Sequence, residues 1–470
     1  MTTGTRGKMI DYFARGENGP VCFLKEFDTK RYWGLLKSIT KKYRIEFDPN
    51  RIVPTDDAEL AELWKAGLEL LLECGILNLD TNRLILFTEE EIRQCLANVP
   101  RSVTLGEGKD ALTATYRGFE DYDAGKNPQC VWGRILGPIS EDLYEKICMS
   151  YVQEPLMDAC HFQGVIPKVK GVDVKPHSPF EILAELQRTA IAKDVCRRGG
   201  RPGLHDGADT PVSFQAVMAA ANLNWGATKG DARNAYIMPH LKTNYDQMSR
   251  ALYWHQCGMN LQGCGQAYIG GVVGGPATAA VNCTAELIAY IMLYDTTILA
   301  TWPIDALYFS NSSKNCLYVA NFAGAAFEKH TKWPLLWGAP LQMTAGIGSE
   351  EYFWESATGA IGCTALGFGC AGGTGHQSGG LDHACGLGVR FVAEVGQAVA
   401  EARLTRAQAN DLVLKCNAKY QPLIDKRTLH TIGGDFRECY DLNTIQPKKE
   451  YLAIYERVKA ELRELGLPVK

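Results

Sequence analysis

Apolar and polar residues alternate in three different ways along the chain, and the changes divide it into three zones. The first zone, residues 1–125, is rich in charge and mostly helical in pattern. In 56–74, leucines and a tryptophan recur at three- and four-residue steps, the period of a helix with one buried face. A second helix is predicted to begin after Thr88, because Glu91 three positions later completes a capping box.

In the second zone, 126–403, short apolar or glycine-bounded runs alternate with helical stretches. The predicted strands lie within 130–138, 160–167, 195–204, 235–241, 264–273, 303–310, 334–342 and 364–373. The predicted helices cover 141–152, 179–192, 211–223, 245–257, 277–293, 314–327, 350–361 and 386–403. Parallel strands need a crossover, normally a helix, and about eight such units over about 275 residues match a (β/α)8 TIM barrel. The same alternation is typical of a doubly wound open sheet, which stays open as the alternative.

Residues 404–470 return to a helical pattern, and a last helix is predicted over 449–465. The predicted fold is therefore α/β, a (β/α)8 TIM barrel with helical N-terminal and C-terminal additions. We expect a helical N-terminal extension over 1–125, the barrel over 126–403 and a C-terminal helical extension over 404–470.

Composition narrows the class of protein. Hydrophobic residues make up 46% of the chain and charged residues 22%, which predicts a folded globular protein rather than a disordered one. The net charge of −4 provides no basic surface for nucleic acid. The 16 cysteines include no CxxC pair, which favours free thiols in a reducing cytoplasm. We find no run of about 20 apolar residues and no signal-like N-terminus, so we expect no membrane span and a cytoplasmic location.

Catalytic candidates lie in a glycine-rich loop. In a TIM barrel the active site is built by the loops that follow the strands. The loop 199–210 carries His205, Asp206 and Asp209 within five residues. A histidine beside carboxylates can do acid–base work, position a substrate or contribute to a metal site. The structural alternative is a turn that uses Asp and Gly for backbone reasons.

Two further loops supply polar candidates for substrate binding. The segment 261–275 contains Cys264 and Gln266, and 337–344 contains Gln342. A thiol at Cys264 could ligate a metal or attack an electrophile, although a buried cysteine is more often a small apolar residue. The spacing of the histidines and cysteines does not match a standard zinc site, so no metal ligands are predicted.

Several segments, in order along nearly the whole chain, resemble the monomethylamine:corrinoid methyltransferase family. They are LWKAGLELLLECGI, GPISEDLYEKICMSY, KPHSPFEILAELQRT, GRPGLHDGADT, GGVVGG, AGIGSEEYFWES and the tail from DFRECYDLNT to the end. The resemblance implies a cytoplasmic, homo-oligomeric barrel that moves a methyl group from a methylamine to the Co(I) of a separate corrinoid protein. The corrinoid is then supplied by a partner protein, and no cofactor is held tightly by this chain.

The resemblance also shows where this chain departs from the family. The family's enzymes carry pyrrolysine, whose imine captures the amine, and that position aligns with Asp206. A neighbouring family glutamate aligns with Cys264, a family Gln and Tyr with Pro340 and Gln342, and a further glutamate with Arg233. The resemblance thus implies a homologue without pyrrolysine. Its substrate-binding candidates are Cys264, Gln342, Arg233 and Gln266.

Three routes could replace the pyrrolysine chemistry. The donor could already be activated, as a quaternary ammonium or sulfonium compound, with Asp206, Asp209 and aromatic rings around its charge. His205 could instead act as a general acid toward the leaving atom. A metal held by some combination of His205, Asp206 and Cys264 could also activate the donor. The alternatives of other classes are a non-catalytic barrel that binds a small ligand and a zinc-assisted methyltransferase or lyase.

Overall fold

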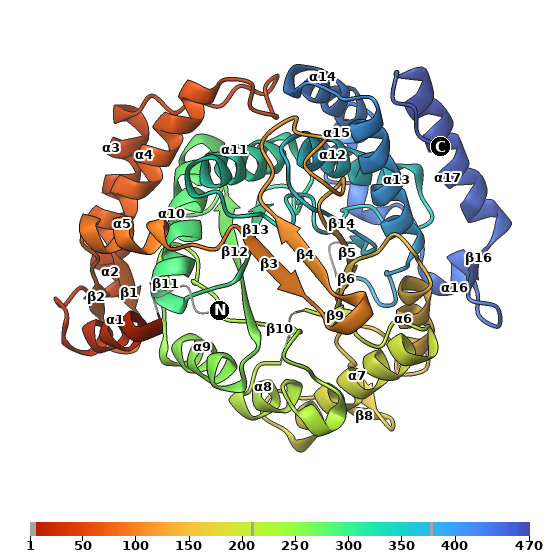
Figure 1. The fold of residues 1–470 in the computed structure, drawn as a ribbon, viewed down its shortest axis with the longest axis horizontal. Helices are drawn as coiled ribbons and strands as arrows, with labels where there is room; N and C mark the ends of the chain where they lie inside the picture. The colour runs from red at the N-terminus through yellow and green to blue at the C-terminus, as the bar shows by residue number, and fades with distance from the viewer. Residues whose placement is uncertain (1–5, 208–210, 377–378) are drawn as a thin grey trace.

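A ring of helices surrounds a central group of strands in the computed structural model, which describes residues 6–207, 211–376 and 379–470 (Figure 1). The central strands are β5 (Val131–Ile135), β6 (Ala159–Phe162), β9 (His205–Asp206), β10 (Ala232–Asn234), β12 (Asn260–Ile269), β13 (Ile298–Asp305) and β14 (Cys370–Gly372). The helices of the ring are α6 (Tyr144–Val152), α7 (Pro179–Arg198), α8 (Phe214–Ala220), α9 (Tyr245–Cys257), α10 (Pro276–Tyr294), α11 (Lys314–Thr331), α12 (Glu350–Ala365) and α13 (Leu387–Glu401).

The central strands form two parallel sheets. One sheet has the order β14-β5-β6-β9 and the other has the order β10-β12-β13. Every pairing within these sheets is parallel, and the strands alternate along the chain with the helices of the ring. The predicted α/β class is therefore confirmed.

The hydrogen-bonded ladder does not run around the whole ring. Between β13 and β14, the segment 333–341 takes the place of a strand, since Leu336 N donates to Leu299 O (3.1 Å) and Gly369 N donates to Leu335 O (3.0 Å). Between β9 and β10, the described residues form no backbone ladder. The predicted barrel is thus confirmed as a ring of parallel strands and helices, while its closure into one continuous sheet is not.

Two of the predicted strands are wrong in position, and a third, 334–342, is not a strand in the structure. The run 195–204 begins as the end of α7, because Val195 and Cys196 belong to the buried face of that helix, and the strand follows at His205. The run 235–241 lies after β10 rather than in it. Its Pro239 has no N–H to donate to a ladder, which disfavours a central strand there. The predicted helices all occur, with ends that shift by several residues in some cases.

Most of the chain before β5 packs on one side of the ring. It contains α1 (Arg6–Asn18), α2 (Leu24–Glu26), the π-helix η1 (Phe27–Tyr32), α3 (Trp33–Lys42), α4 (Asp57–Cys74), β1 (Ile76–Asn78), β2 (Arg83–Ile85), α5 (Glu89–Ala97), β3 (Ser102–Leu105), η2 (Gly108–Asp110) and β4 (Leu112–Thr115). Its hairpin β3–β4 lies across the centre of the ring in Figure 1. The capping box of Thr88 and Glu91 is present at the start of α5, as predicted. Tyr32 donates to Asn282 Oδ1 of α10 (2.7 Å), and β1 pairs with β11 (Lys242–Thr243), so this part is joined to the ring by polar contacts and by a strand.

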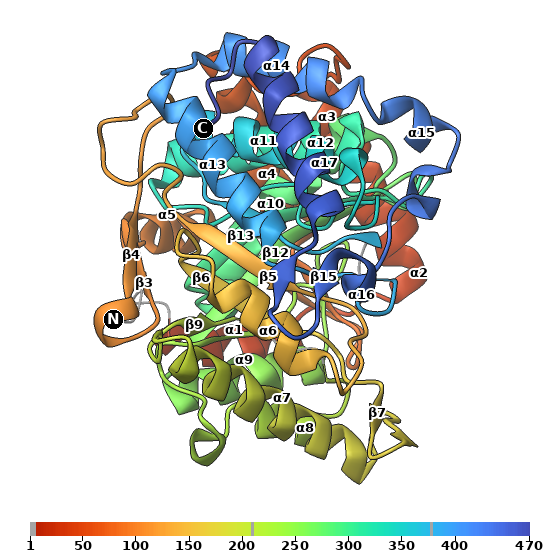
Figure 2. The ribbon, with the colours of Figure 1, turned by 90° about the vertical axis from the view of Figure 1, so that its right-hand side faces the viewer.

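The chain after α13 covers the opposite side. It consists of α14 (Arg406–Asn417), α15 (Gln421–Asp425), η5 (Leu429–Thr431), α16 (Phe436–Cys439), the hairpin β15 (Tyr440–Asp441) and β16 (Gln446–Pro447), and α17 (Lys449–Glu464). In Figure 2, α17 lies over α12 and α13, and the rings of Tyr451 and Phe353 stack there with centroids 5.6 Å apart. One hydrophobic cluster runs through all three parts, so the predicted division into 1–125, 126–403 and 404–470 stays a prediction.

One described helix, α10, has the length and apolar composition of a membrane span. Within its most apolar window, 89% is buried inside the protein, against α4, α11 and β12. A core helix of a globular domain has the same character, and its burial accounts for its apolar sequence.

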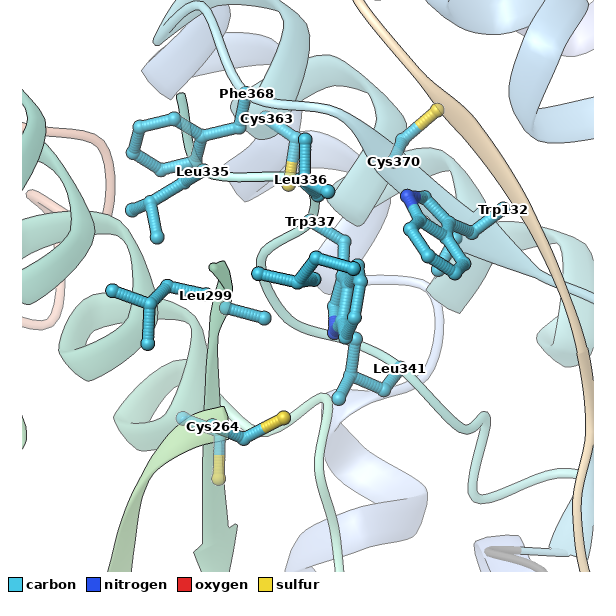
Figure 3. Close-up of a cluster of buried hydrophobic side chains, with 14 of the residues drawn as sticks. Trp132, Cys264, Leu299, Leu335, Leu336, Trp337, Leu341, Cys363, Phe368 and Cys370 are labelled. Atoms are coloured by element: carbon cyan, nitrogen blue, oxygen red, sulfur yellow. The ribbon is translucent and has the colours of Figure 1, made fainter. Parts of the chain in front are cut away.

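The space inside the ring is filled by side chains. Figure 3 shows Trp132 and Trp337 side by side in a cluster that also contains Leu299, Leu341 and Cys264. The two tryptophan rings lie 4.6 Å apart and are fully buried. The interior at this level is therefore a packed core rather than an open channel.

The close approach of Gly369 to the segment 333–341 gives a test of how this segment lies between β13 and β14. A Cβ at position 369 would lie 2.0 Å from the carbonyl oxygen of Leu336 and 2.8 Å from that of Cys130, both backbone atoms. We expect Gly369→Ala to lower the free energy of unfolding by about 3 kcal/mol, as overpacking does. Gly34→Ala is the matched control, since its Cβ meets nothing within 4 Å inside α3, and it should be neutral or stabilising. Equal thermal unfolding midpoints for the two variants would contradict the arrangement.

Candidate active site

A cavity of about 440 Å³ opens at the carboxyl ends of the central strands. It is lined by Gln163, Pro211, Tyr236, Met238, Pro239, Gln247, Arg250, Gln266 and Trp302. Gln163 and Tyr236 follow β6 and β10, while Gln266 and Trp302 belong to β12 and β13. Hollows of similar volume on the N-terminal part, such as one of about 490 Å³ beside Cys22 and Arg31, touch none of the strand ends. The cavity at the strand ends is therefore the candidate active site.

Alternation along the strands decides which side chains face the inside of the ring. A Cβ at Gly133 would point at Tyr151 of α6, so Trp132 and Arg134 on either side of it face inward. Residues that pair across neighbouring parallel strands face the same side of the sheet. Arg134 pairs with His161, so His161 also faces inward. Trp132 pairs with Ala159, which pairs with His205, so His205 faces inward as well. A Cβ at Gly263 would likewise meet Tyr290 of α10, so the neighbouring Gln262 and Cys264 face inward.

Four of these inward groups form what we call the aromatic floor: Trp132, His161, His205 and Trp337. Their ring centroids are 4.5 Å apart for Trp132 and His161, 5.2 Å for Trp132 and His205, and 5.1 Å for His161 and Trp337. Gln163 of the cavity lining lies two residues beyond His161 along the same chain segment. The aromatic floor therefore lies two residues of a strand, about 6.6 Å, deeper than the cavity lining.

Both floor histidines are neutral at pH 7. His205 Nδ1 donates to Gly230 O (2.6 Å), and burial lowers the pKa of His205 to about 4. His161 Nε2 lies 2.8 Å from Gln262 Oε1, and burial, with the nearby charge of Arg134, holds the pKa of His161 well below its usual range. His205 Nε2 and His161 Nδ1 have no hydrogen-bond partner among the described residues. His205 therefore has no proton to give from Nε2 at neutral pH, which disfavours its predicted use as a general acid.

Asp206 faces away from the cavity. Because His205 points inward, the next residue of the strand points toward the helices. Asp206 Oδ2 lies 3.4 Å from Arg188 Nη1 and 3.2 Å from Arg233 Nη2, and all three side chains are buried. Asp206 Oδ1 also accepts a hydrogen bond from Phe162 N (3.3 Å). Its catalytic role stays a prediction that this geometry does not favour.

The other predicted site residues fall in different places. Arg233 pairs with Asp206 outside the cavity, and Gln342 is buried but does not line the cavity. Cys264 faces the interior, where burial raises the pKa of its thiol to about 12 and keeps it protonated. Gln266 lines the cavity. Asp209 lies outside the described residues.

Sequence reasoning missed the inward residues Arg134, His161, Gln163 and Tyr236. The signal for Arg134 was an arginine inside the apolar run CVWGRILGP, where a charge is unexpected. His161 and Gln163 alternate with apolar residues in CHFQG, the pattern of one strand face. Among the described residues, no group of three His, Cys, Asp or Glu side chains could hold a metal ion.

The wall of the cavity is supported by a buried carboxyl group. Glu286 of α10 accepts hydrogen bonds from Gln266 N (2.7 Å) and Asn282 Nδ2 (3.0 Å). Burial raises the pKa of Glu286 to about 8. Asn282 Nδ2 also donates to Gln266 O (2.9 Å). Both backbone groups of Gln266 are thus fixed from behind, which holds its side chain at the cavity.

Comparison with known proteins identifies the family. The family model described as "Monomethylamine methyltransferase MtmB" matches residues 8–467. The chain belongs to this family. It is 30% identical to monomethylamine methyltransferase MtmB2 of Methanosarcina acetivorans over 464 residues, and 30% identical to MtmB3 of Methanosarcina barkeri strain Fusaro over 465 residues. Each alignment covers 97% of both chains.

The fold is shared with solved members of the MtmB family. The crystal structure of the Methanosarcina barkeri monomethylamine methyltransferase matches with a TM-score of 0.88 at 27% identity and 98% coverage of each chain. The structure of a hydroxylamine complex of MtmB matches with a TM-score of 0.89 at the same identity and coverage. The family resemblance expected from the sequence is thus confirmed.

The Asp206 ion pairs make a prediction about stability. Asp206→Asn keeps the size of the side chain but leaves Arg233 without its carboxylate and Arg188 with Glu185 alone. We expect a loss of about 3–5 kcal/mol in the free energy of unfolding, as for other broken buried pairs. Asp123→Asn is the control, because its pair with Arg403 is solvent-exposed and should contribute little. Denaturant unfolding of both variants measures the difference, and a D206N protein as stable as D123N would contradict the assigned pairing.

The neutral state of His205 makes a prediction about pH. Its folded pKa of about 4 lies below the usual value, so between the two values the unfolded chain binds more protons. Stability should therefore fall as the pH falls from about 6.5 toward 4. His205→Asn keeps a donor for Gly230 O but does not titrate. We expect a smaller drop in thermal midpoint between pH 7.5 and pH 5 in H205N than in the wild type. Parallel pH profiles would contradict the assignment.

Proposed function

We propose that this chain transfers a methyl group from a small methylated donor to the Co(I) of a cognate corrinoid protein, and that it does so without pyrrolysine. Membership of the MtmB family supports the reaction class. The observation that carries the proposal for this chain is the cavity of about 440 Å³ at the strand ends, whose lining includes Tyr236 and Trp302. The corrinoid arrives with its own protein and acts as the methyl acceptor.

Asp206, the residue aligned with pyrrolysine, does not replace its chemistry. A carboxylate cannot form the covalent adduct of an imine, and this one is held by Arg188 and Arg233. The donor must therefore carry its own activation or receive a proton. His205 is neutral at pH 7 and uses its only N–H on Gly230. These two facts favour a donor that is already activated, as a quaternary ammonium or sulfonium compound.

The states of Cys264 and Asp206 do not favour a metal held by His205, Asp206 and Cys264. Cys264 is held as a thiol, and the carboxylate of Asp206 is committed to two arginines on the outer face of its strand. A zinc-assisted reaction at His205, Asp206 and Cys264 would need both groups to change state or position.

The lining residues can hold a methylated cation and exclude water. The rings of Tyr236 and Trp302 offer π faces of the kind that bind methylated ammonium groups. The side-chain amides of Gln163 and Gln266 offer oxygen acceptors beside them. With the donor so placed, the carbon–nitrogen or carbon–sulfur bond breaks as the Co(I) electron pair bonds to the methyl carbon. The electrons of the broken bond stay on the leaving nitrogen or sulfur, which becomes neutral, so no proton is required.

We keep the remaining expectations within this proposal: a homo-oligomer in the cytoplasm, with a corrinoid protein as partner and no nucleic acid. The alternative function is a non-catalytic barrel that binds the same class of ligand. The neutral state of both floor histidines is the observation in its favour, since neither can act as an acid at pH 7.

The proposal is tested by a cobalamin absorbance assay. The purified chain is mixed with a Co(I) corrinoid protein and, in turn, with methylated amines, betaines, sulfonium compounds and methyl ethers. We expect the Co(I) absorbance to give way to that of methyl-Co(III) with a donor that carries a quaternary ammonium or sulfonium group. The protein boiled before mixing is the control. Binding of a donor without turnover, for several corrinoid proteins, would favour the non-catalytic alternative and overturn the proposal.

A further inference from the structure

Among the residues that the structure describes, Arg134 is a buried cation without an anionic partner. Its side chain lies in β5, is only 3% exposed, and its Nε and Nη1 find no hydrogen-bond partner in that part of the chain. No described carboxylate is paired with it. The three other arginines of this region differ. Arg188 contacts Glu185 and Asp206, Arg233 contacts Asp206, and Arg250 of the cavity lining contacts Asp246. An isolated buried charge is strongly destabilising, so a protein that keeps one has a use for it.

The guanidinium lies against the aromatic floor, over the ring of Trp337. Its central carbon is 5.4 Å from the ring centroid of Trp337, and Arg134 pairs in register with His161. After burial, the largest influences on the pKa of Arg134 come from two ionisable side chains. They are Cys264, which faces inward, and Tyr236, which lines the cavity. The depth between this level and the lining is about 6.6 Å, two residues of a strand, which an arginine side chain can span.

Further donors without partners surround the same place. The guanidinium covers the ring of Trp337, whose indole N–H is buried and has no acceptor among the described residues. The same holds for the indole N–H of Trp302 in the cavity lining. Buried donors are almost always paired in folded proteins. A group that accepts hydrogen bonds and carries negative charge would satisfy both the guanidinium and these donors.

We propose that Arg134 binds a carboxylate of the methyl donor, so that the donor is a zwitterion such as a betaine or an N-methylated amino acid. The planar guanidinium matches a carboxylate in two parallel hydrogen bonds. With the carboxylate at Arg134, the methylated nitrogen lies toward Tyr236 and Trp302, which places the methyl group at the open end of the cavity. The role of the bound zwitterion as methyl donor rests on the proposed function, while the carboxylate site at Arg134 does not.

The experiment measures binding in the full chain without any corrinoid. Calorimetric titrations use acetate, N-methylglycine and N,N,N-trimethylglycine as carboxylate probes, with choline and tetramethylammonium as cations that lack the carboxylate. We expect N,N,N-trimethylglycine to bind more tightly than choline. In Arg134→Gln its affinity should fall by about 10- to 100-fold, the usual effect of losing hydrogen bonds between charged groups. Arg134→Lys should restore part of the affinity.

Arg117→Gln is the matched control. Arg117 is also buried with unpaired Nε and Nη1, but it donates to Thr364 O (2.7 Å) and lines no part of the cavity. R117Q should bind N,N,N-trimethylglycine as the wild type does. Thermal unfolding checks the fold, and R134Q should melt no lower than the wild type without ligand, because it removes an unpaired buried charge.

The outcomes separate the two proposals. Carboxylate binding that R134Q abolishes and R117Q leaves intact supports the anion site, even if no methyl transfer is found. Methyl transfer from choline or tetramethylammonium at equal rates in wild type and R134Q would support the proposed function and overturn the inference. Absence of binding for all three carboxylate probes, or equal affinities in R134Q and wild type, would also overturn it.

Discussion

The ion pairs of Asp206 join the two halves of the strand ring. No backbone ladder connects β9 to β10 in the described part of the chain, and side chains close the junction instead. Asp206 N donates to Asp231 Oδ1 (2.9 Å), while Arg233 donates to both the carboxylate and the carbonyl of Asp206. Lys193 of α7 pairs with the same Asp231 oxygen (2.7 Å). The candidate site is built on strand ends whose relative positions depend on these contacts.

Strand alternation places the charged residues of this junction on the outer face of the strands. The charged residues of the junction point toward the helices, and the inward face receives His161, His205 and Cys264 in their neutral forms. Burial is the main cause of all three states. A site of this kind positions a donor and excludes water, while it offers little acid or base. Such a site suits a reaction in which the leaving group needs no proton.

The sequence predicted the elements far better than the directions of the side chains. The helix over 245–257 was predicted with the bounds it has, and the capping box of Thr88 was found from two residues, because helix periods and caps are local signals. The strand at His205 is two residues long, too short for periodicity to place it, so Asp206 was expected at the cavity when it faces away. Arg134 was missed because an inward charge in an apolar strand can be judged only once its lack of a partner is known.

The charge of Arg134 bears on which methylated compound fits the candidate site. A simple methylammonium ion placed above the aromatic floor would add a second positive charge near Arg134, and the described lining contains no carboxylate to offset either one. A zwitterion brings its own anion, so the guanidinium is neutralised by the same molecule that supplies the methyl group. The leaving nitrogen then lies near the ion pair of the guanidinium and the carboxylate instead of near an isolated positive charge. We propose that an arginine that costs stability in the free protein thereby selects one class of methylated compound over the amines named for its relatives.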